Sequence, residues 1–260
     1  MPIPATPNDP VSTSTAESAQ VDRILQPGYK HYTNELNQRS SISMPQLLRA
    51  LSLSDVIVQF IYSPHIRQRF NSVDLVIGCG DLPYYYLEYV ISMLDVPLFY
   101  VRGNHDKPVE YSLSGQRQGP IGGIDLHRRT IAHKGAILAG VEGSLRYRPG
   151  EYQYSQGEMW GHVISLFPGL LKNKFKYGRY LDIFVTHAPS QGIHDCSDLA
   201  HQGINAFRWF VDVFKPKYHI HGHIHIYRPD AVMETQCNKT LVINTFGHRE
   251  TVLELEVNKQ

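Results

Sequence analysis

Four short polar fragments occur along the chain, and each follows a run of apolar residues. The fragments are Gly80-Asp81, Gly103-Asn104-His105-Asp106, Thr186-His187 and His221-Gly222-His223-Ile224-His225. Their side chains offer carboxylate oxygens, an amide oxygen and imidazole nitrogens. These groups bind pairs of divalent metals such as Mn, Fe or Zn. The sequence therefore predicts a metal centre built from the four fragments.

A pair of metals in such a centre has a well-defined chemistry. Two ions about 3.5 to 4 Å apart clamp the attacking and leaving oxygens of an in-line displacement and supply a nucleophilic hydroxide at neutral pH. A bridging carboxylate reduces the repulsion between the cations. The glycines at positions 80, 103 and 222 let the backbone come close to a metal or a phosphate. This chemistry is that of phosphate ester hydrolysis.

The first half of the folded region alternates strands with helices, the pattern of an α/β protein. The predicted strands are 48–53, 73–77 and 97–101, and the predicted helices are 56–70 and 82–94. Pro64 should bend or break the first of these helices. Two of the polar fragments therefore follow directly after predicted strands.

The second half predicts a further, more antiparallel sheet. Its expected strands are 124–127, 136–141, 181–185 and 218–220, closed by 241–243 and 252–255. Helices are expected over 159–174, with an interruption at Pro168-Gly169, and over 204–214. The implied architecture is two packed sheets with helices outside.

Composition sets outer limits on the function. The chain has 260 residues and a net charge of +1, so nothing indicates an extended nucleic-acid groove. No apolar run has the length of a membrane span, and the start lacks the features of a signal peptide. The three cysteines are widely spaced, which favours reduced thiols and a cytoplasmic location.

The N-terminal segment differs from the rest of the chain. Residues 1–40 are rich in Pro, Ser, Thr, Asn and Gln. Such a segment buries too little apolar area to offset the entropy of ordering, and we expect it to be disordered or loosely wrapped. Residues 41–260 are expected to form a single domain.

The order of the fragments resembles the calcineurin-like metallophosphoesterases over about residues 47 to 257. The pattern of that family is Asp-x-His, Gly-Asp, Gly-Asn-His-Asp or -Glu, a lone His, and Gly-His-x-His. The resemblance implies a four-layer α/β/β/α sandwich. It also implies six metal ligands: Asn104, His187 and His223 on one metal, Asp55 and His225 on the other, and Asp81 as the bridge.

The resemblance also assigns a catalytic pair. His105 would not bind metal; it would stabilise the transferring phosphoryl oxygens or protonate the leaving oxygen, and Asp106 would hold it. A metal-bound hydroxide would attack phosphorus. The implied substrate is a phosphodiester or a small phosphomonoester, nucleotides included, and Mn is the metal expected to support activity in vitro.

One expected ligand is missing. Ile57 stands where the family has the histidine of its first motif, and isoleucine cannot bind metal. His65 is a conceivable substitute, but it lies beyond Pro64. The first metal position should therefore be weak, so that the protein holds either a single metal tightly or a second metal only at high concentration. An alternative function follows: a catalytically weak or inactive scaffold that binds a protein partner or a nucleotide.

Several further residues are candidates for substrate binding. Arg146 and Arg148 lie in a polar loop and are suited to gripping a phosphate, although a solvated loop explains them as well. Tyr84 starts a run of three tyrosines, one of which is a candidate stacking surface for a base or aryl group. His194 either lines the pocket or only forms hydrogen bonds within its loop. No membrane partner is expected, and the oligomeric state is open.

Overall fold

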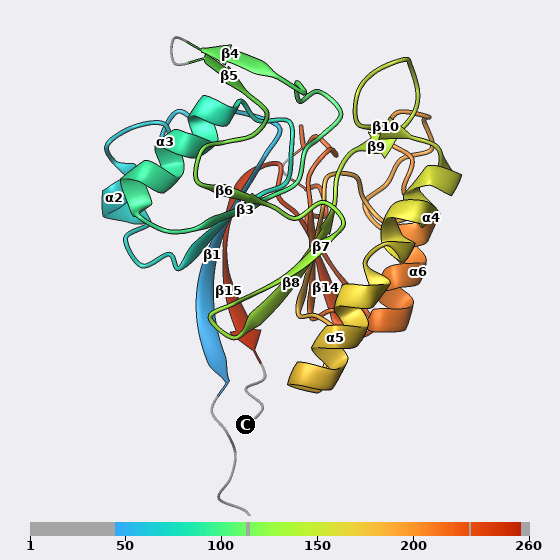
Figure 1. The fold of residues 1–260 in the computed structure, drawn as a ribbon. Helices are drawn as coiled ribbons and strands as arrows, with labels where there is room; N and C mark the ends of the chain where they lie inside the picture. The colour runs from blue at the N-terminus through green and yellow to red at the C-terminus, as the bar shows by residue number, and fades with distance from the viewer. Residues whose placement is uncertain (1–44, 113–114, 229, 256–260) are drawn as a thin grey trace, which may run out of the picture. The chain divides into compact units, whose positions relative to one another are not determined.

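The computed structural model describes residues 45–112, 115–228 and 230–255. The expected disordered segment 1–40 lies outside these residues. From Pro45 onward the chain forms two packed sheets with helices on both outer faces (Figure 1). Among the described residues, none of the helices has the length and apolar character that crossing a bilayer requires.

The first sheet has the strand order β15-β1-β2-β3-β6. Its strands are β1 (Gln46–Ser54), β2 (Leu75–Gly78), β3 (Leu98–Tyr100), β6 (Gly123–Asp125) and β15 (Gly247–Leu255). The first four run parallel to one another, and β15 lies antiparallel to β1 along its whole length. The carboxyl ends of β1, β2 and β3 therefore meet at one edge.

The second sheet has the order β13-β14-β12-β11-β8-β7. Its strands are β7 (Arg129–His133), β8 (Ala136–Val141), β11 (Ile183–Thr186), β12 (Tyr218–His221), β13 (Glu234–Cys237) and β14 (Thr240–Asn244). The four inner strands are parallel, and the two edge strands are antiparallel to their neighbours. Parallel inner strands bury both faces of this sheet.

Helices and two small strand pairs complete the described structure. The helices are α2 (Ile66–Arg69), α3 (Tyr84–Leu94), α4 (Gln156–Ile164), α5 (Phe167–Tyr177) and α6 (Asn205–Phe214). The small pairs are β4 (Glu110–Ser112) with β5 (Gly115–Arg117), and β9 (Ser144–Leu145) with β10 (Gln153–Tyr154). Helices α2 and α3 cover the first sheet, and α4 to α6 cover the second.

Strand alternation divides the apolar residues among three core layers. In β1, Leu48 and Ala50 face the layer between the two sheets, whereas Leu51 and Leu53 face α2 and α3. This is the period of two that a strand dictates. On the far side, the apolar face of α6 packs Phe207 and Phe210 against the second sheet. The family-type four-layer sandwich expected from the sequence is therefore present.

Three element predictions need correction. The segment 56–70 contains turns and the four-residue helix α2 in place of a long helix. The strand predicted at 124–127 belongs to the first sheet, where Ile124 pairs with Phe99 of β3. The last strand, β15, also joins the first sheet. Short apolar runs indicate strands, but they do not specify the pairing partner.

Candidate metal centre

The candidate ligands lie at the carboxyl edges of both sheets. Asp55, Asp81 and Asn104 follow β1, β2 and β3, while His187 and His223 follow β11 and β12. Because the carboxyl ends of parallel strands meet at one edge, residues far apart in the sequence converge there. Hydrogen bonds across the edge join the two sheets, for example from the His223 backbone N–H after β12 to the Asp55 carboxylate after β1 at 3.0 Å.

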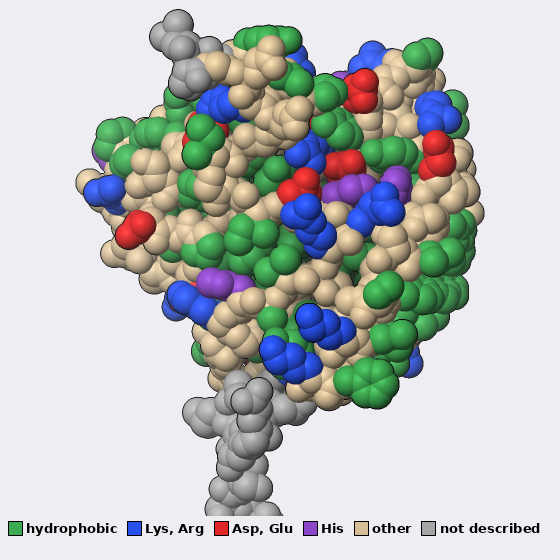
Figure 2. Space-filling model, in the orientation of Figure 1, with side chains coloured by type: hydrophobic (Ala, Val, Ile, Leu, Met, Phe, Trp, Pro, Cys, Tyr) green, Lys and Arg blue, Asp and Glu red, His purple; other side chains and the backbone are tan. Residues whose placement is uncertain are grey.

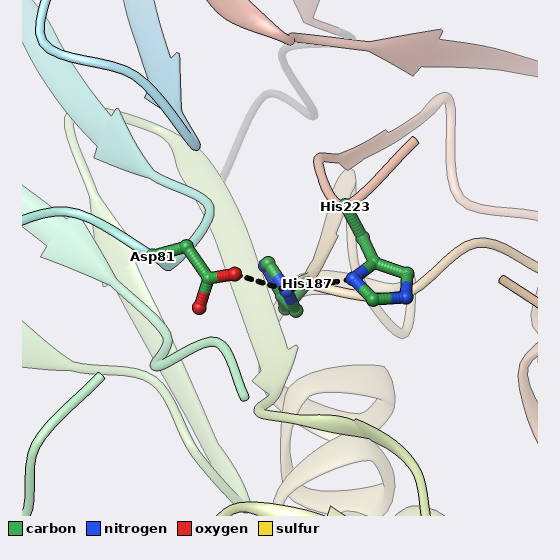
Figure 3. Close-up of side chains that lie close together, drawn as sticks. All are labelled: Asp81, His187 and His223. Atoms are coloured by element: carbon green, nitrogen blue, oxygen red, sulfur yellow. Dashed lines mark hydrogen bonds and ion pairs between the residues drawn. The ribbon is translucent and has the colours of Figure 1, made fainter. Parts of the chain in front are cut away.

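Three candidate ligand atoms surround Nε2 of the buried His187 ring. Its Nε2 lies 3.3 Å from Asp81 Oδ2, 3.0 Å from Asn104 Oδ1 and 3.1 Å from His223 Nδ1 (Figure 3). Neighbouring ligands on an ion with bonds of about 2.1 Å lie about 3.0 to 3.4 Å apart. The spacing of these atoms therefore fits one divalent metal. Among the described residues, Asp81, His187 and His223 form the group of acidic, histidine and cysteine side chains with converging ligand atoms.

The remaining atoms of these side chains hold the ligand atoms in place. His187 Nδ1 donates to the Cys79 carbonyl at 2.7 Å, and His223 Nε2 donates to the Ala200 carbonyl at 2.7 Å. A carbonyl can only accept, so each ring is left with its other nitrogen for a metal. The His105 backbone N–H donates to Asp81 Oδ1 at 2.7 Å, which leaves Oδ2 towards His187. Such outer contacts fix tautomers at metal sites.

Charge is concentrated in this group even without a metal. Burial opposes ionisation of Asp81, but the charge and hydrogen bond of His187 outweigh it and lower the Asp81 pKa to about 2. Burial likewise opposes a charged His187, but Asp81 raises its pKa to about 9. Burial, followed by the charge of His187, lowers the His223 pKa to about 4. A metal would take the place of the proton shared by Asp81 and His187.

The backbone at three candidate ligands is strained. Asp55, Asp81 and His223 have φ angles of 69°, 57° and 67°, in the left-handed region that few non-glycine residues adopt. Residues in such conformations persist when their surroundings hold them, and they gather at functional sites. The strain places these three side chains at the sheet edge.

Two glycines make room for this arrangement. A Cβ at position 103 would collide with the carboxylate of Asp81, and one at position 222 would collide with the side chain of Ser54. Both glycines therefore allow a close approach between the loops that carry the candidate ligands.

The first metal position, that of Asp55 and His225, is less complete. Asp55 accepts hydrogen bonds from the His223 backbone N–H at 3.0 and 3.2 Å, and its Oδ1 lies 3.7 Å from His225 Nε2. Ile57 packs into the apolar layer under α2 and α3. His65 does not replace the missing ligand, because its ring stacks on Phe60 and contacts Gln68. Asp55, Asp81 and His225 are therefore the side chains available to this position.

The surroundings of His105 differ from the expectation. Arg148 donates from its guanidinium to His105 Nδ1 at 3.3 Å. The Asp106 carboxylate does not hold the ring; it accepts from the backbone N–H groups of Gly103, Asp81 and Leu82 at 2.7 to 3.1 Å. The side chain of Asp106 therefore points away from the His105 ring. Its hydrogen bonds tie the Gly80-Asp81 fragment to its own fragment, which begins at Gly103.

Three of the predicted substrate-binding residues have other contacts. Tyr84 is 1% exposed and donates its hydroxyl to the Lys107 carbonyl, so it presents no stacking surface. Arg146 pairs with Glu158 of α4 at 2.9 Å and donates to the Gln153 carbonyl at 3.2 Å. His194 bridges His221 and Thr235, each at 2.9 Å, which is the loop hydrogen bonding considered as the alternative. Arg148 alone of the two arginines reaches the centre.

Tyr147 is a site residue that the sequence did not single out. Its hydroxyl accepts from Asn104 Nδ2 at 3.3 Å, so the amide oxygen of Asn104 is turned towards His187. The sequence feature that could have indicated Tyr147 is the polar loop between β9 and β10, which is rich in Tyr and Arg. The turn of that loop places Tyr147 beside Asn104 and Arg148 beside His105, whereas Arg146 pairs with Glu158.

Comparisons with known proteins agree with this geometry. The model of the calcineurin-like phosphoesterase family matches residues 48–227. The chain belongs to this family. Members of the family are generally metal-dependent phosphoester hydrolases, and the group around His187 is a possible site for such a metal. No curated protein matches the sequence.

Several solved structures align with the chain at low identity. One crystal structure aligns with 82% of this chain and 100% of its own, at 14% identity and a TM-score of 0.53. GAP50, the anchor in the inner membrane complex of Plasmodium, aligns with 76% of this chain and 71% of its own, at 15% identity and a TM-score of 0.45. A single mutant of Vps29 from Entamoeba histolytica aligns with 77% of this chain and 74% of its own, at 11% identity and a TM-score of 0.37.

Proposed function

We propose that this family member hydrolyses a phosphodiester or a small phosphomonoester with the help of divalent metals, with Mn supporting activity in vitro. The observation that supports this proposal is the convergence on His187 Nε2 of ligand atoms from Asp81, Asn104 and His223. His105 and Arg148 lie directly beside this group. A buried set of metal ligands next to a histidine and an arginine that can donate to a phosphoryl group suits phosphoryl transfer.

The residues divide into those that hold metal and those that act on the phosphoryl group. Asn104, His187 and His223 would hold one metal, Asp55 and His225 the other, and Asp81 both. When bound, such metals polarise the phosphoryl group and lower the pKa of a water molecule.

The contact with Arg148 orients the His105 ring towards the substrate. A guanidinium can only donate, so the Nδ1 that faces Arg148 accepts and the ring proton lies on Nε2. The ring therefore presents an N–H donor to a phosphoryl oxygen. This geometry favours stabilisation of the transferring oxygens over protonation of the leaving group, the two roles that the sequence left open.

The test is hydrolysis of bis-p-nitrophenyl phosphate by metal-stripped protein during a Mn titration. We expect turnover that saturates with Mn and is lost in His105→Ala and in Asn104→Ala. Metal stoichiometry at saturation shows how many positions fill. Turnover that is independent of Mn, or that persists in both variants, would contradict the proposal.

Ile57 favours a second candidate, a scaffold that binds a protein partner or a nucleotide with weak or no turnover. The residue leaves the first metal position with Asp55, Asp81 and His225. The Ile57→His variant separates the two functions. If the proposed enzyme holds one metal tightly, the variant should bind a second Mn ion at lower concentration and hydrolyse the substrate faster.

For a scaffold, the same substitution would restore metal binding without turnover. Metal stoichiometry and rate are therefore measured on the same preparation, with Ile57→Val as the matched control that keeps an apolar side chain at this position.

A further inference from the structure

An open groove of about 530 Å³ runs from the candidate metal centre towards the β4–β5 hairpin. Asp81 and His105 line one end, and Tyr85, Lys107 and Tyr111 line the rest. In Figure 2, acidic, basic and histidine side chains gather on the face between the β4–β5 hairpin and the β9–β10 loop. The groove is thus continuous with the proposed reaction site and extends beyond what a phosphate alone would fill.

Aromatic rings are the main apolar surface of the groove. Tyr85 is 44% exposed and Tyr111 is 78% exposed, whereas Tyr84 and Tyr86, on either side of Tyr85, are buried. Tyr62 packs edge-on against Tyr85, with ring centroids 5.9 Å apart, and supports it from behind. A supported, exposed tyrosine ring beside a groove is a stacking surface for a planar group.

The charged residues of the groove differ in whether they have hydrogen-bond or ion-pair partners. Asp106 accepts from three backbone amides, and Glu110 accepts from the Tyr84 backbone N–H at 3.2 Å. Lys107 has no ion-pair partner among the described residues. Its ammonium group is therefore free to meet an anionic ligand.

The position of His105 indicates how a substrate would lie in the groove. Its ring lines the groove, while its Nδ1 is held by Arg148 of the β9–β10 loop. A phosphoryl group beside His105 would have the metal ligands on one side and the groove on the other. The group esterified to phosphorus would then extend over Tyr85 and Tyr111.

We propose that this groove is a specificity subsite for a planar aromatic group on the phosphoester, of the aryl or nucleoside class, with Tyr85 and Tyr111 stacking on the ring and Lys107 attracting the anion. The proposal rests on the proposed function, because it takes the phosphoryl group to lie beside His105. In the hydrolysis, the oxygen of water would form a bond to phosphorus as the bond between phosphorus and the ester oxygen breaks, and a proton of that water would go to the leaving alcohol.

Binding measurements test this subsite without turnover. Two probes are used, the carbon-bridged phosphonate analogues of AMP and of ribose 5-phosphate, which differ by the base and resist hydrolysis at the bridge. Titration calorimetry on the full-length, Mn-loaded protein should show about tenfold tighter binding of the probe that carries the base, as expected for one stacked base. Tyr85→Leu and Tyr111→Leu should remove most of that preference and leave the affinity for the ribose probe within about twofold.

The control variant is Phe175→Leu, which removes an exposed aromatic ring from α5 on the opposite, helical face of the second sheet. It should keep the full preference. Equal affinity for the two probes in the unmodified protein, or an unchanged preference in both tyrosine variants, would overturn the subsite.

Hydrolysis of bis-p-nitrophenyl phosphate by the same preparations separates this inference from the proposed function. Turnover without a preference for the base would leave the enzyme and remove the subsite. A preference for the base without turnover would keep the subsite and remove the enzyme. Far-ultraviolet circular dichroism of each variant verifies that the fold is retained.

Discussion

Two arginines two positions apart have different surroundings. Arg148 reaches the His105 ring at 3.3 Å, whereas Arg146 pairs with Glu158 on α4 and contacts the Gln153 carbonyl. The first is placed to bear on a phosphoryl group, and the second holds the loop to the helix. Composition alone makes the two residues equivalent, so the difference arises from the local turn of the chain.

Replacing each arginine in turn should separate these roles. We expect Arg148→Met to lower kcat/KM for bis-p-nitrophenyl phosphate by about 10- to 100-fold, because one preorganised donor near developing charge is lost. Arg146→Met is the matched control and should stay within about twofold, since exposed ion pairs contribute little. Steady-state kinetics at saturating Mn measures both. Equal losses in the two variants would count against a role for Arg148 at the phosphoryl group.

The short loops after the strands matter most for the placement of the candidate ligands. Asp55, Asp81 and His223 are held at positive φ, and Gly103 leaves space for the carboxylate of Asp81. These loops contact one another closely, so a change of one methyl group at the right position displaces a candidate ligand. At Gly161, within α4, the same change has room.

Alanine should therefore weaken metal binding at position 103 and stabilise the fold at position 161. Gly103→Ala would force the added methyl against Asp81, and we expect metal-stripped protein to lose most of its Mn affinity in calorimetric titration. Gly161→Ala, within α4, meets no atom within 4 Å and should raise the free energy of unfolding by up to about 1 kcal/mol. Chemical denaturation measures the latter. Unchanged Mn binding in Gly103→Ala would show that the loops tolerate more movement than the geometry indicates.

Much of the centre could be predicted because each candidate ligand follows a strand of an α/β sandwich. Orientation within a run of similar residues could not be predicted. Tyr84 and Tyr85 are adjacent and identical, and the first turn of α3 decides that Tyr84 is buried and Tyr85 faces the groove. The helix predicted over 56–70 was wrong, because turns precede the four-residue helix α2 and bury Ile61 there, while Ile66 and Phe70 are buried from α2 and its end.

At the scale of the whole molecule, a buried uncharged histidine links stability to pH. His219 lies wholly inside the second sheet, where its Nε2 donates to the Thr186 hydroxyl at 2.9 Å and Ser190 lies 3.4 Å from its Nδ1. Thr186 in turn donates to the Ala188 carbonyl, so its oxygen accepts from the ring. Burial, and to a smaller extent the neighbouring His194, lower the His219 pKa from 6.5 to about 3.

This lowered pKa sets the direction of the pH effect. Between pH 6.5 and about 3 the unfolded chain binds a proton at His219 that the native protein does not. The free energy of unfolding should therefore fall as the pH is lowered through this window, by up to about 1.4 kcal/mol per pH unit from this residue. Its contribution is fully present above pH 6.5.

Urea unfolding at several pH values between 7 and 4.5 tests the effect. The slope of stability against pH should be smaller in His219→Phe than in the unmodified protein, whatever the absolute stability of the variant. Parallel slopes would assign the pH dependence to other groups.

The pairing of β1 with β15 has a consequence for how the protein is made. Gln46 lies opposite Leu255, and Ser54, directly before Asp55, lies opposite Gly247. The strand that delivers the first candidate ligand is thus held on one side by a segment synthesised about two hundred residues later. During translation from the N-terminus, the nascent chain can form its local helices early, but β1 must wait for β15. We therefore expect the metal centre to be completed only after residue 255 has left the ribosome, and metal acquisition to be a late event in biosynthesis.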